Sequence, residues 1–489
     1  MSQKNETVAL VLSFLVTGGI LGGGAWLLLN GGFNSGNNSS NNNNSNNSNN
    51  SSSNNSSNSS SGNSSNSNAK PILLTESISA GERVFIPSPA SEKSVAASAF
   101  AKENYSEAVN SFSSALAKNK NDPEALIYLN NAKIGKTKSL TIAVSAPIGS
   151  DPNVAQEILR GVAQAQNQVN QSGGINGIPL KIIIADDRNK ADAAQAVAQK
   201  LISNSEVLGV IGNFSSGVTL AAGKVYGDGK LVLISPTSTA VQISGLSKYV
   251  FRTVPSDRFA GDALARYMLT NLKKQKVAVF FNSQSEYSKS IKDVFTTAIF
   301  GSGGQVVKEF DLTSAGFNAS QAVREARDQG AEVLMLASNT SSLDQALQVA
   351  QTNTNPVLPM LGGDDMYDSK TLKVGQQSVE GLVVAVAWHI LGNPEASFPK
   401  EATQLWGGEV NWRSAMAFDA TTSLIAALGK SPTREGVQAA LSSSDFKATG
   451  AANEIKFLPS GDRNQAIQLV KVQKGTRTSF GYEFIPVNP

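Results

Sequence analysis

Between Leu140 and the C-terminus, short apolar runs alternate with longer stretches in which apolar residues recur at helical spacing. The run Leu180–Ala185 (LKIIIA) is apolar at nearly every position, as in strands that are covered on both faces. The stretches between such runs are apolar on one side only, as at Val154, Ile158 and Val162. Strands that alternate with helices predict an α/β fold with a parallel sheet.

This alternation occurs twice, which predicts two similar lobes. The first series has strands at Leu140–Val144, Leu180–Ala185, Val207–Ile211 and Leu231–Ile234. The second series starts after Pro255, with strands at Val277–Phe281, Val306–Phe310, Val333–Leu336, Val357–Leu361 and Leu382–Val386. Each series is expected to form a doubly wound sheet, in which ligands bind beyond the carboxyl ends of the strands.

The N-terminal region differs in composition from the rest of the chain. Thr7–Leu29 is a run of 23 residues without a charge, long enough to span a hydrocarbon layer of about 30 Å. A cleaved signal peptide is the alternative, although its apolar region usually has only about 7–15 residues. We expect residues 1–33 to form an uncleaved signal anchor that crosses the membrane as a helix.

An Asn/Ser-rich linker occupies residues 34–70 and has almost no apolar group to bury, so we expect it to be disordered. It would tether a domain to the membrane; a segment prone to self-association is the alternative. Residues 90–136 then carry apolar side chains at helical spacing, and a further helix is expected after Asp122-Pro123. This segment resembles one and a half tetratricopeptide repeats. Such repeats usually need about three units to be stable alone, so we expect it to pack on a neighbour, as a spacer or as a partner-binding surface.

The composition excludes several classes of function. Lys and Arg number 41 and Asp and Glu 38, a net charge of only +3, which argues against nucleic-acid binding. The chain has no cysteine and one histidine, which excludes disulfides, Cys-ligated zinc and multi-histidine metal sites. A Ser-His hydrolase would need His389 beside a serine and an acid that the sequence does not place. We therefore expect no catalytic residue, no metal and no cofactor, in a protein that is not an enzyme.

Two strand ends of the first lobe carry hydroxyl groups. Ser216 lies where it would be the N-cap of a helix, leaving free N–H groups that favour an anion. Thr237, Ser238 and Thr239 follow the next strand. Helix capping and turn closure are the structural alternatives. Because the two clusters lie one strand apart, they together predict a site for an anionic head group.

The strand ends of the second lobe carry an acid and aromatic residues. Tyr287 follows one strand, and Asp364 follows another after two glycines and would face the gap between the lobes. A carboxylate there could hold an ammonium group, or it could cap the next helix. Asp364, Asp365 and Asp368 do not have the spacing of an EF-hand calcium loop. Trp388 follows the last strand, where it could form the wall of a pocket or pack at a hinge between the lobes.

Residues 140–489 resemble the type I periplasmic ligand-binding proteins of the branched-chain amino-acid (Leu/Ile/Val) transport family. The motifs are GGINGIPLKIIIADD (Gly173–Asp187), VIGNFSSG (Val210–Gly217), LISPTSTA (Leu233–Ala240), VFRTVPSD (Val250–Asp257) and LGGDDMYD (Leu361–Asp368), in the family's order. With the anchor and the helical segment, the chain looks like a cyanobacterial variant. The resemblance implies a ligand-binding domain over 139–489 with three crossovers, lobe 1 being about 139–254 and 387–460 and lobe 2 about 255–386 and 461–489.

The resemblance also implies roles for particular residues. Ser216, Thr237 and Thr239 would bind the α-carboxylate of an amino acid, Asp364 or its neighbour Asp365 would take the α-ammonium, and Tyr287 would close over the ligand. Trp388 lies near a position where the family often has a side-chain wall. Asn339 stands where a tyrosine is often found, and the loop Pro147–Ser150 lacks an aromatic that some members have. These departures concern the ligand's side chain more than its head group, since related proteins also bind amides.

The expected function is therefore a membrane-tethered, extracytoplasmic solute-binding protein that captures an amino acid, most simply of the branched-chain type, for an ABC permease. A ligand-sensing ectodomain that acts through a partner is one alternative, and a scaffold that has lost its ligand is another. Binding is expected to shift an open form of the two lobes to a closed one.

Overall fold

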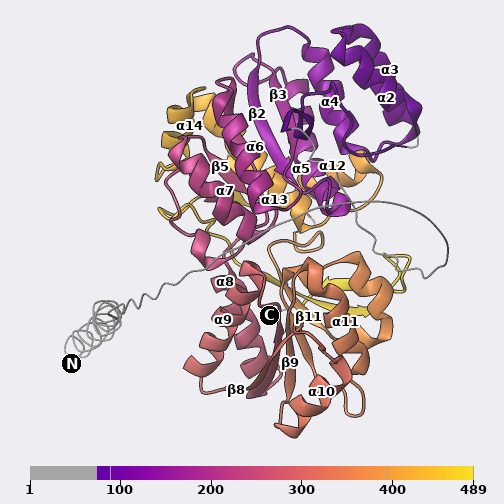
Figure 1. Ribbon diagram of the computed structural model, residues 1–489, viewed down its shortest axis with the longest axis vertical. Coiled ribbons are helices and arrows are strands. Elements are labelled where there is room, and N and C mark those ends of the chain that lie inside the picture. Colours follow the sequence, from indigo (N-terminus) through magenta and orange to yellow (C-terminus); the bar gives the residue numbers. More distant parts are fainter. Residues whose placement is uncertain (1–73, 89, 394, 488–489) are drawn as a thin grey trace, which may run out of the picture. The chain divides into compact units, whose positions relative to one another are not determined.

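The computed structural model describes residues 74–88, 90–393 and 395–487 (Figure 1). The expected anchor at Thr7–Leu29 and the Asn/Ser-rich linker lie outside the described residues. Within the part of the chain that the structure describes, no helix combines the length and the apolar character needed to cross a membrane.

The first sheet has six strands in the order β1-β3-β2-β4-β5-β6. All neighbours pair in parallel except β1, which is antiparallel to β3. The strands are β1 (Ile78–Ser79), β2 (Leu140–Ala146), β3 (Leu180–Asp186), β4 (Val207–Ile211), β5 (Leu233–Ser235) and β6 (Val250–Arg252). The order reverses between β2 and β4, which leaves a crevice at their carboxyl ends.

The second sheet has seven strands in the order β15-β14-β11-β10-β9-β7-β8. They are β7 (Lys276–Phe281), β8 (Gln305–Asp311), β9 (Val333–Ala337), β10 (Met360–Gly362), β11 (Val383–Val386), β14 (Gln468–Lys474) and β15 (Tyr482–Pro486). The first five are parallel and repeat the order of the first lobe, with the reversal between β7 and β9. β14 and β15 are antiparallel additions that the apolar pattern did not predict, because their exposed positions interrupt it.

Helices cover both faces of each sheet, as the alternation predicts (Figure 1). On the first sheet, Ala143 of β2 packs with α6 (Ala191–Ser203) and α7 (Ser216–Asp228), whereas its neighbours Ile142 and Val144 face α5 (Pro152–Gln171) and α13 (Trp412–Lys430). The two lobes also contain α8 (Asp257–Arg266), α9 (Glu286–Gly301), α10 (Ala319–Asp328), α11 (Leu343–Thr352), α12 (Ser397–Trp406) and α14 (Arg434–Leu441). Successive side chains of a strand point to opposite faces of the sheet, and helices cover both faces, so the strand segments are apolar throughout.

The chain passes between the lobes after β6, after β11 and before β14, and a buried arginine joins the first of these passages to the third. Arg252 donates through Nε to Asp462 Oδ1 at 2.6 Å and through Nη1 to the Ala240 carbonyl at 2.8 Å. Arg463 pairs with Asp419 of α13. Each of these side chains is almost fully buried, so each charge needs the partner that it has.

A helical unit extends the edge of the first lobe. It consists of α2 (Ser91–Ala101), α3 (Tyr105–Lys118) and α4 (Pro123–Ile134), and every residue of α4 except Lys133 is buried. Asn131 of α4 donates to the carbonyls of Ala80 and Ile182 at 2.7 Å and accepts the N–H of Ile182. The unit therefore packs on a neighbouring domain, as its shortness predicted; its likeness to tetratricopeptide repeats stays a prediction.

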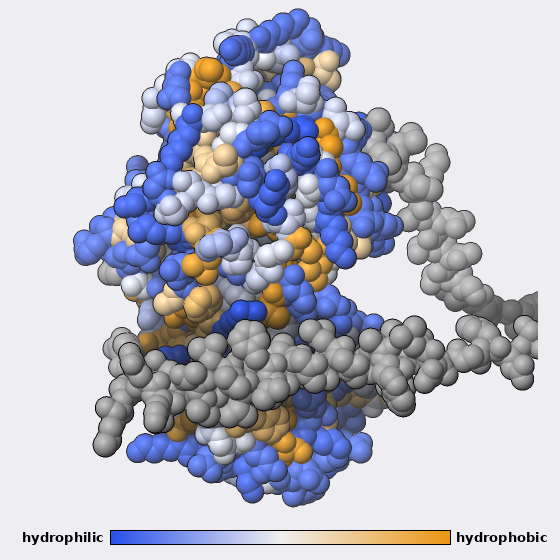
Figure 2. Space-filling view, turned by 90° about the vertical axis from the view of Figure 1, so that its left-hand side faces the viewer, coloured by the Kyte–Doolittle hydropathy of each residue, from blue (hydrophilic) through white to orange (hydrophobic). Residues whose placement is uncertain are grey.

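The outer face shown in Figure 2 is mostly hydrophilic, with apolar side chains in small groups. The large apolar side chains that the structure leaves exposed are Val95, Phe259, Phe300, Val357, Val374, Leu391 and Leu458. They come from different elements, and single exposed apolar residues of this kind are ordinary on a protein surface.

The helical unit depends on one buried cation. Lys93 Nζ lies 2.8 Å from both carboxylate oxygens of Asp122 and 2.8 Å from Glu124 Oε2, with all three side chains buried. We expect Lys93→Ala to lower the free energy of unfolding by about 3–5 kcal/mol, because two buried carboxylates lose their counter-ion. Urea unfolding followed by circular dichroism measures this change.

The control for this experiment is Lys118→Ala. Lys118 also pairs with an acid, Glu92, but its side chain is 61% exposed, so the expected loss is below about 1 kcal/mol. Equal losses in the two variants would contradict the role assigned to Lys93.

Candidate functional site

A cavity of about 410 Å³ lies where the strand ends of the two sheets meet. Its first-lobe lining follows the carboxyl ends of β2, β3, β4 and β5, and its second-lobe lining follows those of β7, β9 and β10. The lining residues are Ser150, Asp151, Asn189, Phe214, Ser215, Ser216 and Thr237 from the first lobe, and Ser285, Tyr287, Asn339, Thr340, Ser341, Asp364 and Asp365 from the second. The cavity therefore occupies the switch-point crevice of both sheets.

Six of the nine predicted binding residues line this cavity and three do not. Those inside are Ser216, Thr237, Tyr287, Asn339, Asp364 and Asp365. Ser238 is buried and donates its hydroxyl proton to the Phe214 carbonyl at 3.0 Å. Thr239 is also buried, next to the buried acid Asp257. The hydroxyl of Ser238 is therefore used within the protein, whereas the carbonyl of Thr239 accepts the N–H of Asp257 of α8 at 2.9 Å.

Trp388 lies outside the cavity, in the apolar core of the first lobe. Its side chain is 2% exposed and meets the ring of Phe398 edge-on, with the ring centroids 5.7 Å apart. The neighbouring His389 is also buried, and its Nδ1 accepts the N–H of Leu391 at 3.2 Å. For both residues the structure shows packing at a lobe junction, the structural alternative to a pocket wall.

Ser216 is the first residue of α7, so the prediction that it is the N-cap is wrong. Ser215 is the N-cap, and its side chain makes no capping bond. The first N–H groups of α7 therefore have no side-chain acceptor and are available to an anion. Ser216 Oγ accepts the N–H of Ala240 at 3.2 Å, which leaves its own proton free to donate.

Thr237 lines the cavity, but its hydroxyl is bonded within the protein. Its hydroxyl donates to the carbonyl of Phe214 at 2.8 Å, so its proton is already used within the protein. Ser215 likewise donates to Asn189 Oδ1. The donors that remain for an acidic group on this side include the hydroxyl of Ser216 and the first turn of α7.

On the other side of the cavity, Asp365 is paired by a residue that the sequence did not reveal. Arg413, at the start of α13, donates through Nη2 to Asp365 Oδ1 at 2.8 Å, and the guanidinium is almost fully buried. Asp365 Oδ2 accepts the N–H of Thr340 at 3.1 Å. Both oxygens are therefore occupied, and the ion pair joins the two lobes. The feature of the sequence that could have pointed to Arg413 is its charge within the largely apolar segment of α13.

Asp364 forms no ion pair with any residue that the structure describes. Its side chain is only 9% exposed. Burial raises the pKa of Asp364 well above its ordinary value, and the charge of Asp365 raises it further. Tyr287 lies beside it, with its hydroxyl oxygen accepting the N–H of Asp365 at 3.4 Å. A buried acid without a counter-ion is ready to accept a cation from a ligand.

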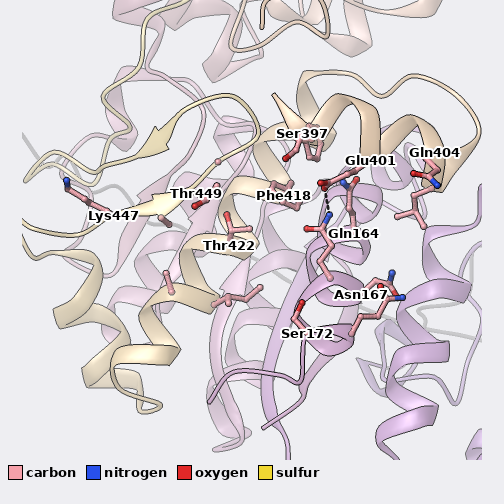
Figure 3. Close-up of a pocket in the computed structure, with 18 residues that line it drawn as sticks. Gln164, Asn167, Ser172, Ser397, Glu401, Gln404, Phe418, Thr422, Lys447 and Thr449 are labelled. Atoms are coloured by element: carbon pink, nitrogen blue, oxygen red, sulfur yellow. Dashed lines mark hydrogen bonds between the residues drawn. The ribbon is translucent and has the colours of Figure 1, made fainter. Parts of the chain in front are cut away.

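The structure has two further cavities, one next to the first cavity and one on the first lobe. One of about 650 Å³ adjoins the first at Asp151 and Thr340 and is lined by Arg413, Tyr367 and Arg477 among others. A larger one, of about 1030 Å³, lies among α5, α12, α13 and the segment Lys447–Gly450 (Figure 3). Every element that lines the larger cavity packs on the first lobe, so closure of the lobes would not enclose a ligand there.

Comparison with known proteins agrees with this architecture. A family model described as "Periplasmic binding protein" matches residues 139–477. An amino acid binding protein of Pseudomonas aeruginosa is 31% identical over 198 residues, which cover 40% of this chain and 52% of that protein. A Leu/Ile/Val-binding protein of Rhizobium johnstonii is 23% identical over 69% of this chain and 92% of its own length.

Solved structures share the fold. A leucine-binding protein of Thermotoga maritima has a TM-score of 0.62 at 22% identity, over 72% of this chain and 99% of its own. A branched-chain amino-acid transporter substrate-binding protein of Streptococcus pneumoniae, in complex with isoleucine, has a TM-score of 0.62 at 17% identity, over 72% and 100% of the two chains. At these identities the likeness concerns the fold alone.

The buried acid Asp257, at the first turn of α8, makes stability depend on pH. Burial raises its pKa to about 6, so the folded protein holds this proton more tightly than the unfolded chain does. The stability it contributes is complete below about pH 4 and is lost as the pH rises towards 6. We expect Asp257→Asn to raise the free energy of unfolding at pH 7 by about 2–3 kcal/mol.

At pH 4 the same substitution should change stability much less, because Asp257 is then protonated in the folded protein and close to half protonated in the unfolded chain. Urea unfolding at the two pH values makes the comparison. An equal effect at both would show that the ionisation of Asp257 is not the cause.

Proposed function

The chain belongs to the periplasmic binding protein family, and on that premise we propose that it captures a free α-amino acid between its lobes for delivery to an ABC permease. It performs no chemistry on the ligand. The relatives named as Leu/Ile/Val-binding proteins make leucine, isoleucine and valine the first ligands to test.

One observation carries this proposal: a buried acid without a counter-ion and an uncapped helix end line the same 410 Å³ cavity. Asp364 would accept the α-ammonium group, with the hydroxyl of Tyr287 beside it. The N–H groups of α7 and the hydroxyl of Ser216 would bind the α-carboxylate. A buried zwitterion needs both of its charges paired, and the two lobes supply one partner each.

The arrangement explains why binding would close the protein. A ligand held by α7 on one lobe and by Asp364 on the other contacts both lobes only when they are together, so it favours the closed form. Contacts that cross the cleft support that form. Besides Arg413 with Asp365, the N–H of Val241 donates to Ser290 Oγ of α9 at 3.0 Å.

The setting of this binding domain follows from the N-terminal sequence. An anchor at Thr7–Leu29 and an Asn/Ser-rich tether would hold the domain at the outer surface of the membrane, within reach of a permease. The helical unit α2–α4 would then be a spacer that caps the first lobe, since its α4 is already buried.

Removal of the acid tests the proposal. We expect Asp364→Ala to abolish detectable binding of amino acids, with Kd raised at least about 100-fold, because the α-ammonium would be buried without a counter-charge. Isothermal titration calorimetry with the amino acid that binds the unaltered protein best measures the loss.

The control is Asp328→Ala, at the exposed end of α10, which should leave Kd unchanged. Near-normal affinity in Asp364→Ala would assign the ammonium to another group. A protein that binds no amino acid at all would overturn the proposed function.

A further inference from the structure

The cavity has an unusual lining for a branched-chain side chain. Of the residues that line it, only Phe214 and Tyr287 have a large apolar surface, and none is aliphatic. The others offer hydroxyls, amides and carboxylates. A leucine side chain placed there would gain little from apolar contact and would separate polar groups from water without giving them a partner. The polar lining therefore favours a ligand whose side chain makes hydrogen bonds.

The charges of the cavity are also unbalanced. Three of its lining residues are acids, Asp151, Asp364 and Asp365, and none is a lysine or arginine. Arg413 reaches from behind the lining and is bonded to Asp365. In the proposed function, Asp364 takes the α-ammonium of the ligand. One acid, Asp151, then remains without a cation.

Asp151 is held in place by a bond that uses only one of its oxygens. It is the N-cap of α5, where Oδ1 accepts the N–H of Val154 at 3.2 Å. Among the described residues, no group bonds its other carboxylate oxygen. The side chain is half-buried and lines both the 410 Å³ and the 650 Å³ cavities. It is therefore fixed, partly desolvated and free to accept from a ligand.

Two more polar groups of the lining add acceptors. Thr340 has a buried hydroxyl without a partner among the described residues, and its own N–H is bonded to Asp365. The hydroxyl can therefore accept a hydrogen bond without breaking one. Ser150 is exposed beside Asp151. A side chain with several N–H donors would find acceptors on both lobes.

We infer that the ligand is a basic amino acid, with Asp151 as the partner of its side-chain cation. This inference rests on the proposed function, since it assumes that the α-ammonium and α-carboxylate are bound as described. Lysine, ornithine and arginine have this chemistry. The ligand would bring two positive charges to Asp364 and Asp151 and one negative charge to α7, so every buried charge gains a partner.

The test compares ligands on the full chain, purified in detergent. Titration calorimetry with lysine, ornithine and arginine is set against leucine, isoleucine and valine. We expect the basic amino acids to bind at least 10-fold more tightly. In Asp151→Asn, the affinity for lysine should fall at least 10-fold while that for alanine, which has no side-chain cation, stays within about 2-fold. Asparagine is as good an N-cap as aspartate, so α5 is preserved.

Asp328→Asn is the matched control, since it removes one carboxylate from an exposed site in the second lobe and should change neither affinity. Tighter binding of leucine than of lysine, or an Asp151→Asn protein that keeps its affinity for lysine, would overturn this inference and leave the proposed function intact. A protein that binds none of these amino acids, alanine included, would overturn the proposed function itself.

Discussion

The ion pair between Asp365 and Arg413 is the interaction on which the cleft depends. Two adjacent acids, Asp364 and Asp365, are buried at one strand end, and two neighbouring carboxylates cannot both remain charged there without a cation. Arg413 reaches across from the other lobe and neutralises one of them. The same bond therefore holds the lobes together and decides which acid remains for a ligand. Without it, the two aspartates would be equivalent candidates.

A second constraint comes from the topology. The five parallel strands of each sheet follow the same order, so each sheet has its reversal at a corresponding place, and the loops at these two places line one cavity. The three passages of the chain between the lobes keep them together, and buried arginines join the first passage to the third and the third to α13. A ligand that contacts both lobes therefore changes the position of two connected lobes relative to each other, and does not have to bring two independent domains together.

The cavity combines groups that the fold supplies with groups that depend on single side chains. The N-terminus of α7 and the acid Asp364 line it from opposite lobes, an arrangement that suits a zwitterion. The rest of the lining includes Asp151 and Thr340 and has no aliphatic side chain. The helix end follows from the fold, whereas the other lining groups are individual side chains, which differ freely between relatives of low identity.

The α/β class, the two lobes and nearly all the parallel strands could be predicted from the order of residues, because strands buried on both faces must be apolar at every position. The sequence also located six residues of the cavity, since the ends of such strands are where binding residues lie. It did not reveal β14 and β15, whose exposed positions break the pattern, or Arg413, which lies far along the chain from Asp365. Contacts between distant parts of the chain were needed to show that Thr237 donates its proton to the Phe214 carbonyl, that Trp388 packs in the core and that Asp364 is the acid without an ion pair among the described residues. Those outcomes depend on which groups meet across the fold, and such pairings leave no periodic trace in the order of residues.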